Sequence, residues 1–190
     1  MNLLLATTNR DKVREIRGIL SGLEVTLLTL DDLSAIAPPE ETGLTFEENA
    51  RLKALYYAAT SGHLVVAEDS GLEIDALGGR PGVESARFGG EGTLYPEKFE
   101  LLYAQGAAGS PARFVCALAL AGGEGVLFEA RGVVEGRIAP SPAGDGGFGY
   151  DPIFFYPPFG TTLAEAPGRK SEVSHRGAAF RSLRRFLEDR

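Results

Sequence analysis

The sequence contains one cysteine, Cys116, and no tryptophan among its 190 residues. A single cysteine excludes an intramolecular disulfide and any cysteine-based metal cluster. The formal net charge of −7 argues against a general nucleic-acid binder and against binding to anionic membranes, because both need a basic face. No apolar run approaches membrane-spanning length, and the short run after Met1 does not make a signal peptide. A cytoplasmic location is therefore the default expectation.

Amide side chains are also scarce, with three Asn and one Gln, and arginine outnumbers lysine by fifteen to four. This composition fits a heat-adapted source, although a GC-rich genome would produce it too. The chain is long enough for a real core, and its hydrophobic content of 44% is ordinary for a soluble globular protein. No repeat or sharp boundary divides it, so residues 1–190 are expected to form a single domain.

The sequence is organised around residues 64–75, L-V-V-A-E-D-S-G-L-E-I-D. The apolar run from Leu64 to Ala67 predicts a short buried strand that ends at Glu68 and Asp69. Ligands and metals gather at strand ends in open α/β sheets, and carboxylates there are costly unless something positive meets them. Asp69 is thus the candidate for the residue on which the chemistry of the site centres. The alternative is that both acids merely solvate a turn.

The N-terminal stretch predicts a strand at 2–6, a polar turn at 7–9 and a helix capped by Asn9. This arrangement turns backbone N–H groups toward an anion. Lys12 lies in the first helical turn, where the helix dipole disfavours a cation, and a bound anion would explain it. The alternative is an ordinary cap followed by a solvated lysine. There is no P-loop motif.

A second acidic candidate is Glu41, in a proline- and glycine-rich loop at 34–44. The helix that follows opens with a capping box, Thr45 and Glu48, which explains Glu48 but not Glu41. This helix is expected to run to about Ser61 and to bury Leu52, Leu55, Tyr56 and Ala59. Further elements are predicted at 24–28 (strand), 93–105 (helix), and 113–121 with 126–138 (a hairpin, hence a mixed sheet).

Two later segments carry further candidates. Between 140 and 160, glycines flank Phe148, whose ring is therefore free to stack on a planar ligand, and Asp151 precedes a proline and is placed to accept bonds from a base edge. Near the C-terminus, Ser174 is a natural N-cap. It would place His175 and Arg176 at a helix N-terminus, where two cations favour an anionic or carbonyl-rich ligand.

Hard carboxylates without histidine or cysteine neighbours suit Mg²⁺, which binds nucleotide phosphates through one or two such ligands. Together with the polar turn, the aromatic residue and the cationic helix start, they predict a metal-dependent nucleotide site. The residue types alone do not say which bond is broken.

The chain resembles the inosine/xanthosine triphosphate pyrophosphatase family. The motifs that carry the resemblance lie in order along essentially the whole chain: A-T-T-N-R-D-K at 6–12, E-E-T-G-L-T-F-E-E-N-A at 40–50, A-E-D-S-G-L-E-I-D-A-L-G-G-R-P-G-V-E-S-A-R at 67–87, G-G-F-G-Y-D-P-I-F-F at 146–155 and S-H-R-G at 174–177.

The resemblance implies hydrolysis of ITP, dITP and XTP to the monophosphate and pyrophosphate, with Mg²⁺ as cofactor and a homodimer as the assembly. It implies an elongated, two-lobed α/β fold, with a long twisted mixed β-sheet flanked by helices and a nucleotide cleft between the lobes. No nucleic acid or membrane partner is expected.

Residue roles follow from the same resemblance. Asp69 would be the general base, and Glu41 with Asp69 would hold the metal. The phosphate-binding residues would be Thr7, Thr8, Asn9, Lys12 and Ser70. The base-binding residues would be Phe148, Gly149, Tyr150, Asp151, Lys170, His175 and Arg176. The role of Glu68 stays open between a second metal contact and an aid to the base, and Pro167-Gly168 is an unusual feature just before Lys170.

Two alternatives are kept. The related septum-inhibitor-type pyrophosphatases act on modified pyrimidines, but their S-x-S-P-R-R-type opening is absent here. A nucleotide-binding or sensing module without turnover would keep Lys12, Phe148 and Arg176 but would not need Asp69.

Overall fold

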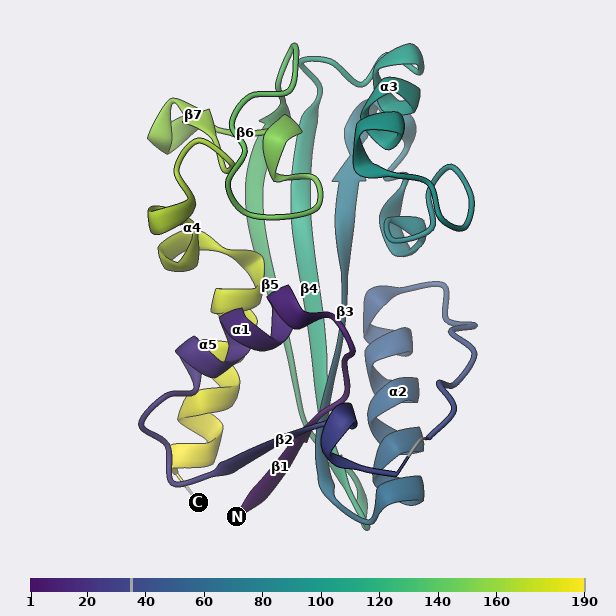
Figure 1. Cartoon of the computed structure of the whole chain (residues 1–190), viewed down its shortest axis with the longest axis vertical. Coiled ribbons are helices and arrows are strands. Elements are labelled where there is room, and N and C mark those ends of the chain that lie inside the picture. Colours follow the sequence, from purple (N-terminus) through teal and green to yellow (C-terminus); the bar gives the residue numbers. More distant parts are fainter. Residues whose placement is uncertain (35, 190) are drawn as a thin grey trace. The chain divides into compact units, whose positions relative to one another are not determined.

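The computed structural model describes residues 1–34 and 36–189 (Figure 1). By its internal contacts the chain divides into two compact units. Unit 1 comprises Met1–Asp69, Cys116–Gly132 and His175–Arg190, and unit 2 comprises Ser70–Val115 and Val133–Ser174. Each unit is described by itself below. One residue of the predicted loop at 34–44, Ala35, lies outside the described residues.

One mixed sheet contains seven strands in the order β2-β1-β3-β4-β5-β6-β7. The strands are β1 (Asn2–Leu5), β2 (Thr26–Thr29), β3 (Leu64–Ile74), β4 (Pro111–Gly122), β5 (Gly125–Ile138), β6 (Phe154–Tyr156) and β7 (Thr161–Thr162). β1 is parallel to β2 and to β3, whereas β6 is antiparallel to β5 and β7. Only residues 123 and 124 separate β4 from β5, and a connection this short joins antiparallel neighbours. The predicted hairpin and mixed sheet are confirmed.

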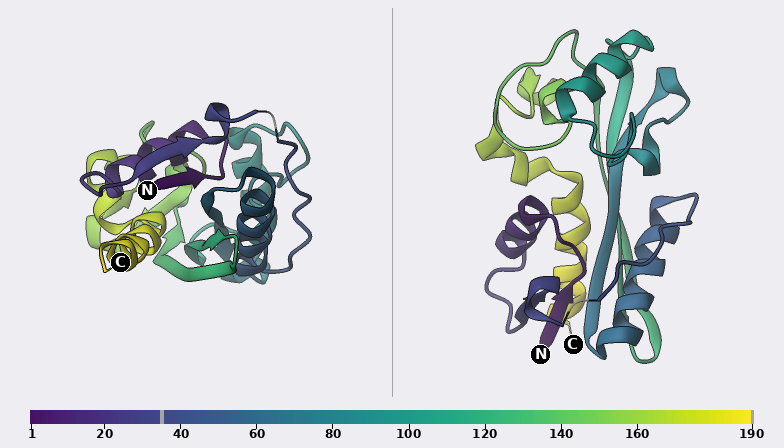
Figure 2. Two further views of the ribbon diagram at one scale, coloured as in Figure 1. Left: turned by 90° about the horizontal axis from the view of Figure 1, so that it is seen from below. Right: turned by 45° about the vertical axis from the view of Figure 1, so that its right-hand side comes forward.

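The α-helices of the described residues are α1 (Arg10–Ile19), α2 (Phe46–Ser61), α3 (Tyr95–Ala104), α4 (Pro167–Val173) and α5 (His175–Glu188). Within unit 1, α1 and α5 lie side by side on one face of the sheet and α2 covers the opposite face (Figures 1 and 2). No helix in this described set has the length and apolar character needed to cross a membrane.

Local sequence explains where the unit 1 helices begin and end. The Asn9 side chain accepts hydrogen bonds from the N–H groups of Asp11 and Lys12, so the predicted cap of α1 is confirmed. The capping box of Thr45 and Glu48 opens α2 as predicted. Gly62 ends α2 in the left-handed conformation, with φ of 70°.

Two predictions about burial and strand length are wrong. The buried face of α2 is formed by Phe46, Asn49, Ala50, Ala54, Tyr57 and Ala58, whereas Leu55 is 38% exposed. Apolar side chains occur all round this helix, so their pattern does not specify which side faces the sheet. The strand that begins at Leu64 does not end at the two acids, but continues through them to Ile74.

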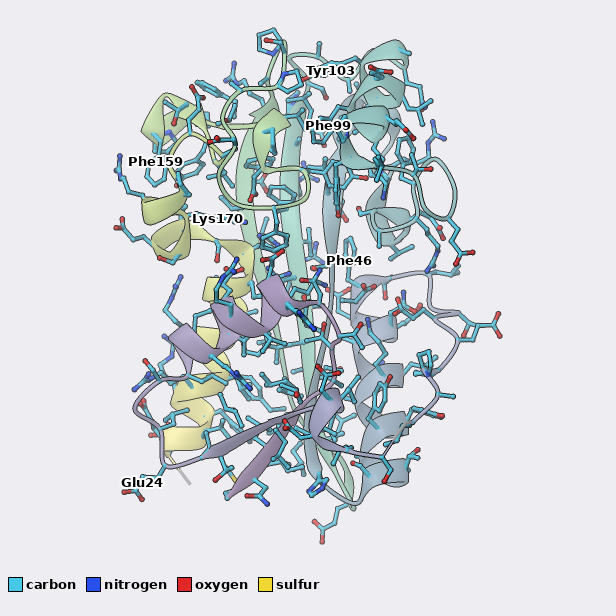
Figure 3. The ribbon with its side chains drawn as sticks, in the orientation of Figure 1. Glu24, Phe46, Phe99, Tyr103, Phe159 and Lys170 are labelled. Atoms are coloured by element: carbon cyan, nitrogen blue, oxygen red, sulfur yellow. The ribbon has the colours of Figure 1, made fainter. Side chains whose placement is uncertain are left out.

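Each unit has its own apolar core. In unit 1, α1 and α5 pack on β1, β3 and β4 through Ile16, Leu20, Phe180 and Leu183. In unit 2, Phe99 of α3 is buried among Leu72, Leu102 and Phe154, and Tyr103 packs against this cluster (Figure 3). Phe154 is fully buried in β6.

Candidate active site

Strand β3 places Glu68 and Asp69 on opposite faces of the sheet. Successive side chains of a strand alternate between faces, and Val66 belongs to the core that α1 and α5 cover. Glu68 shares that face, two residues further along. Asp69 points to the other face, where α2 lies. Both acids are buried in mid-strand, so the interpretation that they solvate a turn is wrong. Burying them is possible because each meets cations.

On the α2 face, Asp69 belongs to a cluster with Asn49, Lys53 and Glu41. The Asn49 amide donates to Asp69 Oδ2 over 3.1 Å. Lys53 Nζ lies 3.1 Å from Glu41 Oε1 and 3.7 Å from Asp69 Oδ1. Asn49 and Lys53 are four residues apart on α2 and so share one side of the helix. The two acids predicted as metal ligands therefore already share one cation.

The loop that carries Glu41 is tied to the same cluster through Gly43. The Gly43 N–H donates a hydrogen bond to Asn49 Oδ1 over 2.8 Å. A Cβ at this position would lie 2.6 Å from that oxygen and 2.9 Å from the Asn49 backbone nitrogen, so only glycine fits without a shift. Asn49 thus links the loop to Asp69 with a single amide group.

The environment of Asp69 favours a proton acceptor. Burial raises the pKa of Asp69 above its ordinary value, and Lys53 and the Asn49 hydrogen bond partly oppose this effect. A carboxylate with a raised pKa accepts a proton more readily than a solvated one. These are the properties required of a general base that accepts a proton from water.

The donor set of this cluster fits Mg²⁺ with two protein ligands. No group of three or more His, Cys, Asp or Glu side chains with metal-binding geometry occurs among residues 1–34 and 36–189. Mg²⁺ is usually bound through one or two carboxylates, with phosphate and water oxygens completing its octahedron. Glu41 and Asp69, held around one ammonium group, satisfy that requirement.

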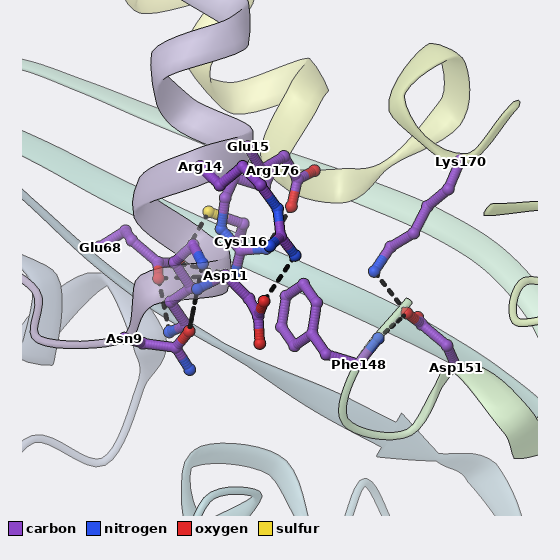
Figure 4. Close-up of polar contacts among 11 residues, drawn as sticks. Asn9, Asp11, Arg14, Glu15, Glu68, Cys116, Phe148, Asp151, Lys170 and Arg176 are labelled. Atoms are coloured by element: carbon purple, nitrogen blue, oxygen red, sulfur yellow. Dashed lines mark hydrogen bonds and ion pairs between the residues drawn. The ribbon is translucent and has the colours of Figure 1, made fainter. Parts of the chain in front are cut away.

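On the other face, Glu68 is the centre of a buried ionic cluster (Figure 4). Its carboxylate lies 2.5 Å from Lys12 Nζ and 3.4 Å from a guanidinium nitrogen of Arg176. Arg176 also contacts Glu15 over 2.9 Å, and the Cys116 thiol donates to Glu68 over 3.2 Å. Burial alone would raise the pKa of Glu68, but Arg176 and Lys12 lower it well below 4.5. Glu68 is therefore ionised in the folded protein.

The polar turn at 7–12 differs in one respect from the predicted anion-binding turn. Asn9 caps the N–H groups of Asp11 and Lys12, and its own N–H donates to Thr7 Oγ1 over 3.2 Å. Three backbone donors are thus already used, and Lys12 is paired with Glu68. Thr8 and Asn9 are exposed. A phosphate at this turn would therefore meet exposed side chains and backbone N–H groups other than these three.

In unit 2, Phe148, Asp151 and Lys170 form a third cluster (Figure 4). Asp151 Oδ2 accepts from Lys170 Nζ over 2.6 Å and from the Phe148 N–H over 2.8 Å. Lys170 Nζ also lies 4.2 Å from the centre of the Phe148 ring. Gly147 has φ of 71°, and a Cβ there would collide with the Asp151 carboxylate. These contacts fix the loop that presents the aromatic ring.

Three further predicted site residues belong to unit 2, namely Gly149, Tyr150 and Ser70. Tyr150 is buried and donates through its hydroxyl to the Ser85 carbonyl over 2.8 Å, and burial raises the pKa of its phenol. Gly149 has φ of 70°, close to Tyr95. Ser70 is the half-buried residue of β3 that follows Asp69. Tyr150 thus anchors the loop, and its hydroxyl is committed to the backbone.

His175 and Arg176 begin α5 in unit 1, and both are buried. Ser174 ends the short α4 in extended conformation, and α4 itself was not predicted. On β5, a Cβ at Gly132 would lie 2.7 Å from the Ala179 backbone nitrogen, so glycine allows α5 to approach the strand closely. His175 and Arg176 thus lie in the first turn of α5, as predicted, and Arg176 joins the Glu68 cluster.

Sequence reasoning missed Lys53, Asn49 and Glu15. One signal was available, since Asn49 and Lys53 have the four-residue spacing that places polar side chains on one side of a helix. Nothing in the sequence paired them with Glu41 and Asp69, because that pairing depends on α2 packing across β3.

Comparisons with known proteins give a consistent result. The Ham1 family model matches residues 3–186. A relative from Exiguobacterium sp. (strain ATCC BAA-1283 / AT1b), named dITP/XTP pyrophosphatase, is 48% identical and covers 96% of this chain and 95% of its own length. A relative with the same name from Thermus thermophilus is 47% identical and covers 100% and 93%.

Solved structures point to the same family. A HAM1 protein from Coxiella burnetii superposes with a TM-score of 0.91 at 38% identity and full coverage of both chains. A nucleoside-triphosphatase / dITP/XTP pyrophosphatase from Mycobacterium abscessus gives 0.79 at 41% identity, covering 96% of this chain and 97% of its own. The family resemblance and the fold class predicted from the sequence are confirmed, and the chain belongs to the Ham1 family.

Proposed function

We propose that this protein hydrolyses deaminated purine nucleoside triphosphates, namely ITP, dITP and XTP, to the monophosphate and pyrophosphate, and so removes them from the nucleotide pool. The observation that carries the proposal is the cluster of Asp69, Lys53 and Glu41, a buried base candidate beside two groups suited to a metal and a phosphate. Relatives at 44–48% identity are named dITP/XTP pyrophosphatase, which supports the substrate class.

In the proposed reaction, Asp69 accepts a proton from a water molecule whose oxygen forms a bond to the α-phosphorus. The bond between that phosphorus and the bridging oxygen to the β-phosphate breaks, and pyrophosphate leaves. Mg²⁺, held by Glu41 and Asp69, would neutralise charge on the phosphate oxygens. Lys53 keeps the two carboxylates together and contributes a positive charge, while Asn49 fixes the orientation of Asp69.

The remaining predicted residues divide between phosphate and base. Thr7, Thr8, Asn9, Lys12 and Ser70 are proposed to bind the triphosphate. Phe148 is proposed to stack on the base, with Gly149, Tyr150, Asp151, Lys170, His175 and Arg176 shaping its site and contacting its edge.

Base selectivity follows from hydrogen-bond polarity. The 6-keto oxygen of hypoxanthine or xanthine accepts hydrogen bonds, whereas the 6-amino group of adenine donates them. Donors such as His175 and Arg176 would match the keto group and leave adenine with an unmatched contact, at a cost of about 1–3 kcal/mol for each buried group. A homodimer and a cytoplasmic location complete the proposal, the first from the family resemblance and the second from the proposed substrate pool.

The test is an assay of ITP, XTP, GTP and ATP, with and without Mg²⁺, in which the products are identified. We expect pyrophosphate from ITP and XTP only when Mg²⁺ is present, and little from ATP. Asp69→Asn should abolish turnover while ITP still binds. Glu73→Gln is the matched control: it is the same kind of change on the same strand, but in a partly exposed ion pair with Arg113, and it should retain activity.

Stepwise release of inorganic phosphate would refute the pyrophosphatase reaction. Tight binding of ITP without hydrolysis would instead favour a nucleotide-binding or sensing module, which would need Lys12, Phe148 and Arg176 but not Asp69.

A further inference from the structure

Glu68 is buried on the face opposite Asp69 and takes part in neither proposed metal binding nor proton transfer. It is 4% exposed, and the alternation of β3 directs it to α1 and α5, away from Glu41 and Lys53. Its contacts are therefore with Lys12, Arg176 and Cys116, while its negative charge is one of the groups that raise the pKa of Asp69 through the strand. A buried carboxylate of this kind needs another explanation, because burying it is costly.

The contacts of Glu68 join two cations that come from distant parts of the chain. Lys12 belongs to the first turn of α1, and Arg176 to the first turn of α5. Both approach the same carboxylate, at 2.5 Å and 3.4 Å, and Arg176 is only 1% exposed. Lys12 is proposed to bind the triphosphate and Arg176 to contact the base edge, so one carboxylate contacts a residue from each of the two proposed functions.

We propose that Glu68 is a positioning residue for turnover, which fixes the Lys12 ammonium and the Arg176 guanidinium in the places where the nucleotide meets them. The proposal rests on the proposed function. It assigns Glu68 no contact with substrate, metal or the reacting atoms, and its effect passes through the two cations.

Charge balance gives this role a kinetic signature. The four ionic groups of the cluster, Lys12, Arg176, Glu68 and Glu15, sum to zero. Glu68→Gln leaves the cluster with one positive charge, which favours binding of a polyanionic nucleotide, but it removes the group that fixes Lys12. Ground-state binding should therefore persist while the alignment needed in the transition state is lost. A misplacement of about 1 Å can cost about a hundredfold in rate.

The matched control is Glu15→Gln. It makes the same change of charge in the same cluster and removes a contact to Arg176, but leaves the ion pair between Lys12 and Glu68. Lys12→Met gives the contrasting case, because it deletes the proposed phosphate contact itself. Glu68→Asp keeps the charge with a shorter side chain and tests rescue by a conservative change.

Steady-state hydrolysis of ITP with Mg²⁺ tests the proposal on purified variants whose circular dichroism spectra match the unmodified protein. For Glu68→Gln we expect kcat to fall by about 10- to 100-fold with KM unchanged or lower. Glu68→Asp should recover part of kcat. Glu15→Gln should keep kcat within about threefold, and Lys12→Met should raise KM.

The proposal is overturned if Glu68→Gln keeps kcat within about threefold, if it raises KM at constant kcat, or if Glu15→Gln loses as much kcat as Glu68→Gln. If Glu68→Gln does not fold, Glu68→Asp decides the matter, since unchanged kcat there overturns the proposal and reduced kcat at constant KM supports it. Failure of the proposed function is seen separately, as absence of pyrophosphate release from ITP by the unmodified protein, and the proposal falls with it.

Discussion

Replacing Asp151 with asparagine perturbs the contact that fixes the Phe148 loop in unit 2. Asp151 is 1% exposed and accepts two hydrogen bonds through Oδ2, from Lys170 Nζ over 2.6 Å and from the Phe148 N–H over 2.8 Å. Asparagine has nearly the same shape. Its amide oxygen can still accept from the Phe148 N–H, but it carries no charge to meet the buried ammonium of Lys170.

The magnitude follows from these two contacts. Removing one partner of a buried ion pair costs about 3–5 kcal/mol, because the other charge stays buried. Since asparagine keeps the backbone contact, we expect the lower end, about 3 kcal/mol in the free energy of unfolding. For a chain of this size that corresponds to a fall in Tm of about 6–12 °C. Asp151→Ala should cost about 1–3 kcal/mol more, since the Phe148 N–H loses its acceptor as well.

Urea unfolding followed by far-ultraviolet circular dichroism and tyrosine emission measures these changes, and the absence of tryptophan leaves the tyrosine signal undisturbed. Lys170→Met serves as the matched partner variant, because it keeps most of the side-chain volume without the charge. The double variant Asp151→Asn/Lys170→Met should lose less free energy of unfolding than the two single variants lose together, by about 2 kcal/mol.

The reasoning is refuted if Asp151→Asn changes the free energy of unfolding by less than about 0.5 kcal/mol, or if the two substitutions prove additive. Either result would mean that the ion pair is open to solvent or that the loop is held by other contacts. Loss of stability should also be accompanied by a raised KM for ITP, because the loop carries the proposed stacking ring.

The remaining predictions concern a glycine, a pH dependence and a thiol. In thermal unfolding, Gly147→Ala should lower the free energy of unfolding by about 1–2 kcal/mol because of its left-handed backbone, and by about 1–3 kcal/mol more because the new Cβ collides with Asp151. Gly160→Ala is the control. Its φ is 69° and nothing lies near its Cβ, so it should show only the backbone cost. Since the pKa of Glu68 is lowered well below 4.5 on folding, the stability it contributes is complete above about pH 4.5 and is lost as the pH falls through the folded-state value. The destabilisation caused by Glu68→Gln should therefore shrink in urea titrations below pH 4.5, and a constant difference would contradict the assignment. Burial and the adjacent carboxylate raise the pKa of Cys116 well above 9.0, so the native protein should react with a disulfide reagent at least about a hundredfold more slowly than the unfolded chain.

Local sequence was sufficient for several elements of the fold. Side-chain oxygens at Asn9 and Thr45 satisfy N–H groups within the next three residues, so the starts of α1 and α2 depend on neighbours alone. The same is true of Gly62 at the end of α2 and of the tight hairpin between β4 and β5. The family resemblance was also carried by the sequence, because its motifs are contiguous.

The strand through Glu68 and Asp69 could not be predicted locally. Two adjacent acids, a serine and a glycine normally indicate a turn. Ion pairs with Lys12, Lys53 and Arg176, together with the hydrogen bond from Asn49, make the burial of the acids acceptable. Those partners lie far from the two acids along the chain. The buried face of α2 was missed for a similar reason, since apolar residues occur all round the helix and only its packing on the sheet decides which of them are buried.

The sequence by itself thus determined the family, the starts of α1 and α2, and the acids and cations that carry the proposed chemistry, with the exception of Lys53. Tertiary structure decided which of them meet. Adjacent residues of a strand point to opposite faces, so Asp69 joined Glu41 and Lys53 beneath α2, while Glu68 joined Lys12 and Arg176 beneath α1 and α5. That division depends on which helix covers which face of the sheet, which no short-range pattern specifies.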